Sequence, residues 1–137
     1  MNPERKEGKK YTDVSIAILE QNGRFWVAKL APEDRYAGKW EFPGGKRESG
    51  ETYEDAVLRE VREELGIEAE IIKALPVIDY EFRGENTQLF RLYGFLCKVG
   101  KGSLKMHKEH VEHRWVTLEE LKELDILESD RQILSFL

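Results

Sequence analysis

The feature that most constrains this chain is a segment with helical periodicity at residues 53–65. Thr52 is suited to cap its first turn, with Asp55 three residues later, and Gly66 is suited to end it. At about 100° per residue, its apolar side chains share one arc. They are Val57, Leu58, Val61 and Leu65. The pattern predicts an amphipathic helix that buries this arc.

A cluster of carboxylates occupies the neighbouring arc of the same helix. It consists of Glu60, Glu63 and Glu64. Like charges at this spacing cost about 0.2–0.5 kcal/mol per pair on an exposed helix. A divalent cation would reverse the penalty, because Mg²⁺ and Mn²⁺ prefer carboxylate oxygens and bridge them to substrate phosphates. Taken alone, the cluster is also compatible with a solvated helix face.

Strand patterns dominate the remainder of the chain, so we predict an α+β fold with helices around a mixed sheet. The predicted strands are 14–20 and 25–30, joined at Asn22-Gly23, followed by 70–82, 89–99 and 111–116. We expect a polar loop at 31–39 and a turn at 83–88. The closing helical segments are 118–124 and 130–136, the second with Ser129 or Asp130 available as its cap.

The composition is that of one globular domain over residues 1–137, of which 40% are apolar. Its apolar stretches are far shorter than the roughly 20 residues of a membrane helix. Residues 1–10 are mostly polar, which predicts a flexible terminus without a secretory signal and a cytoplasmic protein. The single cysteine, Cys97, has apolar neighbours and is expected to be a buried thiol.

The net charge of −5 does not favour a large nucleic acid as partner. A small polyphosphate can still bind if divalent cations supply positive charge. We therefore expect a small anionic ligand, no nucleic acid and no membrane partner.

Glycine, glutamate and arginine recur at fixed spacings over 23 residues that include the helix. The positions are Gly45, Glu51, Arg59, Glu60, Val61, Glu63, Glu64, Gly66 and Ile67. This set resembles the signature of the Nudix hydrolase family, with every fixed position matched. The resemblance implies a Nudix-like α/β/α sandwich with a mixed sheet, a catalytic loop–helix–loop and C-terminal helices. It also implies Mg²⁺ or Mn²⁺ as cofactor and hydrolysis of a nucleoside diphosphate linked to another group.

The resemblance also assigns roles to residues of the motif. The implied metal ligands are Glu60, Glu63 and Glu64, together with the backbone carbonyl of Gly44. Arg59 and Glu51 occupy positions that orient these ligands and brace the loop. Metals held there would polarise phosphoryl oxygens and lower the pKa of a bound water, so no covalent nucleophile is needed.

The run from Trp40 to Lys46 resembles the MutT-like branch of the family. Members of that branch hydrolyse nucleoside triphosphates to monophosphate and pyrophosphate, and several clear oxidised nucleotides such as 8-oxo-dGTP. Phe42 and Lys46 are therefore candidate substrate-binding residues. In purely structural terms, Trp40 and Phe42 are alternating strand residues and 43–45 is a turn. Phe42 can serve both roles.

Two acidic residues outside the motif are further candidates. Glu109 precedes Trp115 where MutT-like proteins carry a glutamate that binds metal or accepts a proton from the attacking water. Glu112 is its rival, and both are compatible with a solvated loop. Asp130 lies where MutT-like enzymes contact the base, and its carboxylate can accept hydrogen bonds from guanine or cytosine. The alternative role of Asp130 is the helix cap.

One position departs from the pattern, because Leu30 stands where the family often has an arginine that contacts phosphate. Lys29 and Arg35 are candidates to replace it. Three lysines in a later loop either meet phosphate or are solvated: Lys101, Lys105 and Lys108. Three histidines recur nearby: His107, His110 and His113. We do not expect them to form a transition-metal site, because a segment running from a loop into a strand need not make them converge.

Alternative functions remain open at this stage. The same chemistry could act on ADP-ribose, a dinucleoside polyphosphate or a capped RNA end. A catalytically silent nucleotide sensor is the alternative from another class, although intact metal-ligand positions argue against it. The sequence predicts neither the preferred base nor the oligomeric state.

Overall fold

The protein is built on one mixed sheet, seen in a computed structural model that describes residues 10–137. Residues 1–9 of the predicted flexible terminus lie outside the described part. The strands are β1 (Thr12–Gln21), β2 (Arg24–Leu30), β3 (Trp40–Glu41), β4 (Gly44–Lys46), β5 (Ile67–Ala74), β6 (Ile78–Phe82), β7 (Gln88–Gly102) and β8 (His110–Val116). The helices are α1 (Tyr53–Leu65), α2 (Leu118–Glu123), α3 (Glu128–Arg131) and the 3-10 helix η1 (Gln132–Phe136).

The centre of the sheet is a long parallel pair, β1 beside β7, with Thr12 opposite Phe90. The main strand order is β3-β2-β1-β7-β5, and every other pairing is antiparallel. The predicted first hairpin is confirmed: Asn22 and Gly23 both have positive φ, 53° and 77°. Such angles suit the tight turn between β1 and β2.

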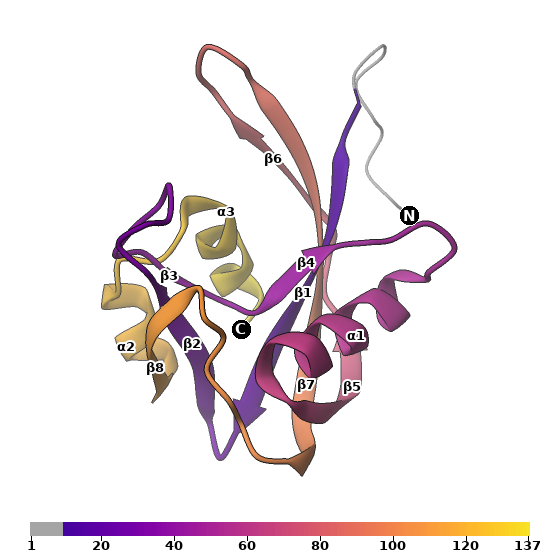
Figure 1. The fold of residues 1–137 in the computed structure, drawn as a ribbon, viewed down its shortest axis with the longest axis vertical. Helices are drawn as coiled ribbons and strands as arrows, with labels where there is room; N and C mark the ends of the chain where they lie inside the picture. Colours follow the sequence, from indigo (N-terminus) through magenta and orange to yellow (C-terminus); the bar gives the residue numbers. More distant parts are fainter. Residues whose placement is uncertain (1–9) are drawn as a thin grey trace.

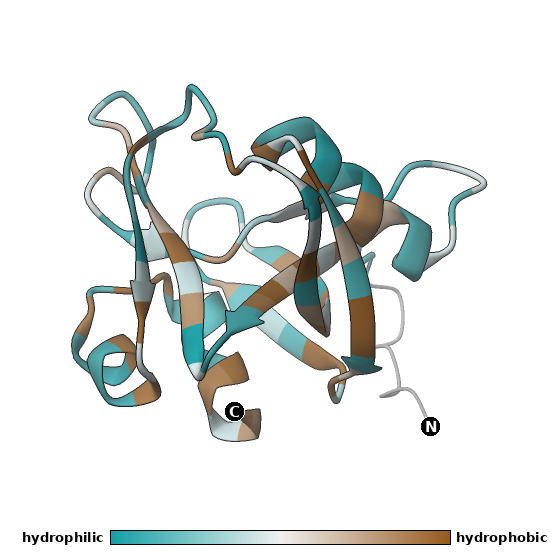
Figure 2. Ribbon diagram, turned by 90° about the horizontal axis from the view of Figure 1, so that it is seen from below, coloured by the Kyte–Doolittle hydropathy of each residue, from teal (hydrophilic) through white to brown (hydrophobic). Residues whose placement is uncertain are grey.

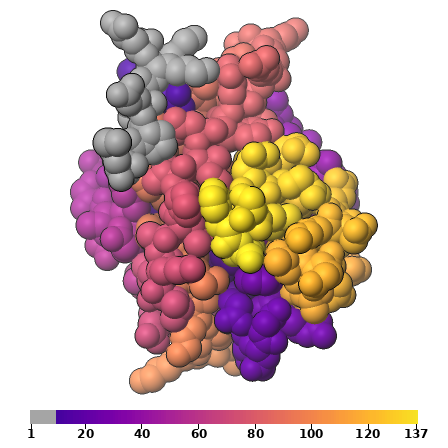
Figure 3. All heavy atoms as spheres, turned by 180° about the vertical axis from the view of Figure 1, so that it is seen from behind, coloured from indigo at the N-terminus to yellow at the C-terminus, as the bar shows by residue number. Residues whose placement is uncertain are grey.

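Helices cover both faces of the sheet (Figure 1). On one face, α1 packs its apolar arc against alternate residues of β1 and β7 such as Leu19 and Phe95. On the other, Leu121, Ile126 and Ile133 from the C-terminal segment pack against residues of β1 and β2. Figure 3 shows the C-terminal helices lying over that face, and apolar stretches follow the strands between the layers (Figure 2). The predicted α/β/α sandwich is therefore confirmed.

Helix α1 has the predicted ends. The side chain of Thr52 accepts a hydrogen bond from the backbone N–H of Asp55, and Gly66 closes the helix with φ 70°. A left-handed residue at this position is well suited to glycine. Val57, Val61 and Leu65 of the predicted apolar arc are fully buried, whereas Leu58 is half-buried.

Two predictions of local structure, one of a strand and one of a turn, were wrong. The segment predicted as a single strand at 70–82 is two strands, β5 and β6, separated around Pro76, which lacks the N–H that a continuous ladder needs. The predicted turn at 43–45 instead leads into β4, which pairs with β1. Gly44 is required there, because a Cβ at this position would overlap the backbone carbonyl of Ser15.

The end of the chain also differs from the prediction. The helix expected at 130–136 is split into α3 and η1, and α3 begins after Leu127 without any side-chain cap. Neither Ser129 nor Asp130 caps it, since both lie inside α3. No helix among residues 10–137 has the length and apolar character needed to cross a membrane.

Candidate active site

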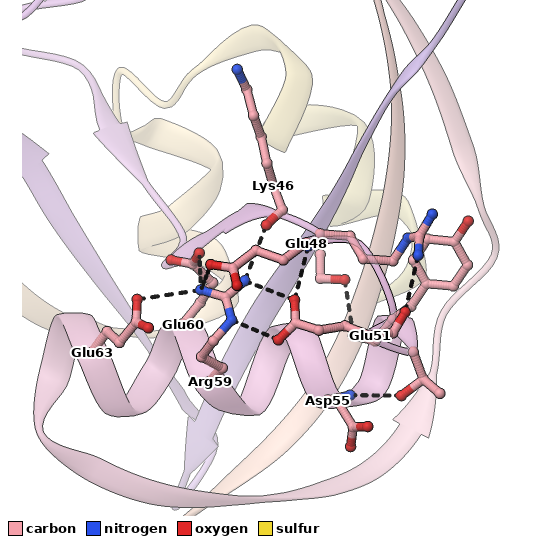
Figure 4. A network of polar contacts seen from close by, with 11 residues as sticks. Lys46, Glu48, Glu51, Asp55, Arg59, Glu60 and Glu63 are labelled. Atoms are coloured by element: carbon pink, nitrogen blue, oxygen red, sulfur yellow. Dashed lines mark hydrogen bonds and ion pairs between the residues drawn. The ribbon is translucent and has the colours of Figure 1, made fainter.

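The loop before α1 is bound to the helix through Arg59 (Figure 4). Its guanidinium donates two parallel hydrogen bonds to Glu51, 2.6 Å from Nε and 3.0 Å from Nη2. It also donates to Glu60 at 2.9 Å and Glu63 at 3.3 Å, and to the carbonyl of Lys46 at 3.1 Å. The bonds to Glu51 lower the pKa of that carboxyl and raise the pKa of Arg59. Arg59 therefore stays charged and holds loop and helix in one geometry.

The carboxylate of Glu60 lies directly against the backbone of Gly45. A Cβ on Gly45 would be 2.5 Å from both Cδ and Oε1 of Glu60. Only glycine leaves that space, so the motif glycine admits Glu60 to the surface formed by β4. Glu63 lies farther out, with its side chain 58% exposed.

Glu64 is the most perturbed carboxyl of the cluster. Burial raises its pKa to about 9, helped by a hydrogen bond with Glu60 and by the charges of Glu60, Glu41 and Glu109. Acidic side chains from α1, β3 and the loop before β8 therefore act on Glu64 electrostatically. Glu112, the rival of Glu109, instead forms an ion pair with Arg114 at 2.7 Å. The geometry favours Glu109 as the additional carboxylate.

A cavity of about 420 Å³ opens beside this cluster. Its lining includes Gly44, Glu64 and Glu109, together with Phe42 and Asp130. The remaining lining includes Tyr36, Phe82 and Phe90, whose rings supply apolar walls, and the acids Asp34 and Glu41. Among residues 10–137, Arg35 is the only basic residue in the lining. Without added cations, so acidic a cavity would repel a polyphosphate.

Asp130 is buried in the wall of the cavity rather than at a helix end. Its carboxylate accepts a hydrogen bond from the backbone N–H of Phe42 at 2.9 Å, and the residue is only 4% exposed. Burial, together with the charge of Glu41, raises the pKa of Asp130 to about 8. At neutral pH this side chain is largely a neutral carboxylic acid, which can both donate and accept a hydrogen bond.

The structure places Arg35 at the cavity and the other candidate basic residues away from its lining. Arg35 lines the cavity together with Leu30, the residue that replaces the expected arginine. Lys29 is half-buried and is not part of the lining. The Lys46 side chain extends away from the Arg59 network in Figure 4 and does not line the cavity either. None of the three later lysines borders it: Lys101, Lys105 and Lys108.

Two of the three histidines lie near each other, with the ring centroids of His107 and His110 6.2 Å apart. His110 is buried against Glu41, whereas His113 stacks on Trp26 with ring centroids 5.7 Å apart. His107 is in the preceding loop. Cys97 is fully buried, and burial raises its pKa to about 12, so it is no nucleophile.

The pairing of Glu41 with His110 was missed from sequence, where His110 was considered only as one of three histidines. Glu41 carried a usable signal, because it is a charged residue between the apolar strand residues Trp40 and Phe42. His110 carried none, because its burial depends on β8 pairing with β2.

The donor set of the cluster suits a hard divalent cation. Glu60, Glu64 and Glu109 offer oxygen ligands, and their mutual repulsion is what a cation would relieve. In residues 10–137 no three His, Cys, Asp or Glu side chains already form a closed metal-binding group. Arg59 accounts for part of this, since it bonds to both Glu60 and Glu63. A cation that binds here must compete with that guanidinium.

Comparison with known proteins agrees with this geometry. The family profile described as the NUDIX domain matches residues 9–137. Nucleoside triphosphatase NudI of Enterobacter sp. (strain 638) is 35% identical over 127 residues, covering 83% of this chain and 87% of that protein. CTP pyrophosphohydrolase of Escherichia coli (strain K12) is 33% identical over 125 residues, covering 91% and 90%.

A third relative and a solved structure extend the comparison. The 8-oxo-dGTP diphosphatase of Escherichia coli (strain K12) is 35% identical over 82 residues, covering 59% of this chain and 64% of that protein. The crystal structure of a MutT NUDIX hydrolase from Burkholderia pseudomallei superposes with a TM-score of 0.80 at 29% identity, covering 93% of this chain and 98% of that one.

Proposed function

This chain belongs to the Nudix hydrolase family, and we propose that it hydrolyses a nucleoside triphosphate to nucleoside monophosphate and pyrophosphate. The observation that carries the proposal is a cavity lined both by Glu64 of the α1 carboxylate cluster and by Phe42, Phe82 and Asp130. A nucleotide has the matching parts, a flat base at one end and a metal-binding polyphosphate at the other.

The proposed cofactor is Mg²⁺ or Mn²⁺, held by Glu60, Glu63 and Glu64 with Glu109 and the carbonyl of Gly44. When bound, the metal supplies positive charge for the phosphoryl oxygens and acidifies the attacking water. Glu51 and Arg59 brace the loop and the ligands through the hydrogen bonds described above. Arg59 must release or share Glu60 and Glu63 when the cation enters.

The proposed base-reading residue is Asp130, with Phe42 packing against the ring. Because burial and the charge of Glu41 raise the pKa of Asp130 to about 8, its carboxylic acid offers one donor and one acceptor at neutral pH. The relatives named as acting on CTP and on 8-oxo-dGTP support a nucleoside triphosphate as substrate, including an oxidised one. The choice among bases rests on a few such hydrogen bonds.

Among the basic candidates, Arg35 is proposed to contact phosphate in place of the arginine that Leu30 replaces, since it alone borders the cavity. Lys29 and Lys46 stay weaker candidates for substrate binding. We also propose that the chain acts as one domain and works in the cytoplasm on free nucleotides.

The test is a panel assay for pyrophosphate and phosphate release with Mg²⁺ or Mn²⁺. The panel holds ordinary, oxidised and methylated nucleoside triphosphates, ADP-ribose and a dinucleoside polyphosphate. Fast release of pyrophosphate from one triphosphate supports the proposal. Turnover of only ADP-ribose or the dinucleotide would keep the family chemistry but reject the substrate, and binding without turnover would favour a nucleotide sensor.

A further inference from the structure

A buried histidine–glutamate pair lies in the cavity wall and has no role in the chemistry described so far. The side chain of His110 is 2% exposed, and its Nε2 lies 2.8 Å from Oε2 of Glu41. Its Nδ1 is buried without a hydrogen-bond partner among the described residues. A buried, half-satisfied imidazole is costly compared with an apolar side chain, so packing alone does not explain it.

Glu41 is the partner of His110 that faces the cavity. Its side chain is 24% exposed and belongs to the lining. Its charge acts on Glu64 in the carboxylate cluster and on Asp130 in the base pocket, raising the pKa of both. The carboxylate of Glu41 is therefore close enough to both Glu64 and Asp130 to act on them electrostatically, and it borders the same cavity.

The backbone around His110 is anchored on both sides. The N–H of His110 donates to the carbonyl of His107 at 2.9 Å, and the carbonyl of the neighbouring Glu109 accepts from Ala31 at 2.8 Å. Leu30 is the register partner of His110 in β2. The imidazole of His110 is therefore carried by a hydrogen-bonded backbone and can hold the longer side chain of Glu41 in place.

We propose that His110 is a positioning residue for substrate recognition. It donates its Nε2–H to one oxygen of Glu41 and so directs the other oxygen toward the cavity. There that oxygen accepts a hydrogen bond from an N–H or O–H group of the base or sugar of the nucleotide. Because the carboxylate of Glu41 is already held in place, less side-chain entropy is lost when the nucleotide binds. The inference rests on the proposed nucleotide substrate.

The test compares His110→Phe, which keeps a ring but loses the donor, with His110→Gln, which keeps an N–H donor. His113→Phe is the matched control on the same strand, since His113 lies outside the cavity lining. With the best triphosphate of the panel, we expect His110→Phe to raise KM about tenfold and to change kcat less than about threefold. His110→Gln should bring KM back to within about threefold of wild type, and His113→Phe should leave it unchanged.

A second pair of variants tests whether His110 acts through Glu41. Glu41→Ala should raise KM about as much as His110→Phe, and adding His110→Phe to Glu41→Ala should raise it no further. An unchanged KM in Glu41→Ala, or additive effects in the double variant, would overturn the inference. Equal increases of KM in His110→Gln and His110→Phe would overturn it too. A general disturbance of the fold affects both variants alike, whereas loss of the N–H donor affects only His110→Phe. If His110→Phe does not fold, the KM values of Glu41→Ala and His110→Gln test the inference in its place.

The inference can fail separately from the proposed function. Wild-type turnover of a triphosphate combined with an unchanged KM in His110→Phe overturns the inference alone. If the wild type turns over no nucleotide, the affinity for CMP measured by calorimetry replaces KM. Wild-type affinity in His110→Phe then overturns the inference, and absence of CMP binding by the wild type overturns both.

Discussion

Replacing Gly45 by alanine should separate catalysis from folding. The new Cβ would lie 2.5 Å from Cδ and Oε1 of Glu60. Carbon atoms in contact are about 3.5–4.0 Å apart, so the carboxylate must withdraw by about 1 Å. A misplacement of that size at a reacting centre costs about 100-fold in rate, or about 2.7 kcal/mol of barrier. We therefore expect kcat to fall about 100-fold.

The fold should tolerate the change, because the group displaced is the end of a flexible side chain. Gly44→Ala is the informative contrast. There the new Cβ meets the backbone of Ser15 and Ile16, so β4 must move away from β1. Overpacking of this kind costs about 1–3 kcal/mol, which would lower Tm by several degrees.

The assay is pyrophosphate release at saturating nucleotide and Mg²⁺, with thermal melts of the same samples. Gly84→Ala is the control, since a Cβ at Gly84 meets nothing within 4 Å and its φ is not in the left-handed region. It should keep both kcat and Tm. Wild-type kcat in Gly45→Ala, or a loss of Tm equal to that of Gly44→Ala, would refute the reasoning.

Four other predictions follow from the site. Glu63→Gln and Glu64→Gln should each lower kcat by about 100-fold or more with an unchanged far-UV spectrum; wild-type turnover in both would reject them as metal ligands. Arg59→Lys loses the two parallel bonds to Glu51 and should lower kcat about tenfold while Tm stays within a few degrees; unchanged kcat in steady-state assays would show that the bracing is unimportant. Asp130→Ala should reorder the ranking of bases in the panel assay, and equal slowing of every nucleotide would count against base reading. The pKa of Asp130 is about 8 in the folded protein and 3.8 in a free chain. Between these two pH values the folded protein keeps the proton on Asp130 and the unfolded chain loses it. The free energy of unfolding therefore falls as pH rises through this range. Asp130→Asn should flatten that decline in urea melts at pH 5 and pH 7.5, and an unchanged decline would place the pH dependence elsewhere.

The sequence by itself determined the helices and turns that are fixed by residues close together in the chain. Thr52 and Gly66 bound α1 as expected because capping joins residues within one turn. Asn22-Gly23 formed its hairpin for the same local reason. The carboxylate arc of α1 follows from helical geometry alone, so the centre of the proposed metal site was predictable.

The walls of the cavity were decided only by the tertiary structure. Asp130 reaches the backbone of Phe42 across 88 positions, and His110 reaches Glu41 across 69. The choice between Glu109 and Glu112 depends on how β8 lies along β2, where the register shifts between Lys29 and Leu30. A shift of one residue turns every side chain of a strand to its opposite face. Strand propensity does not encode that register, and only packing of the whole sheet selects it.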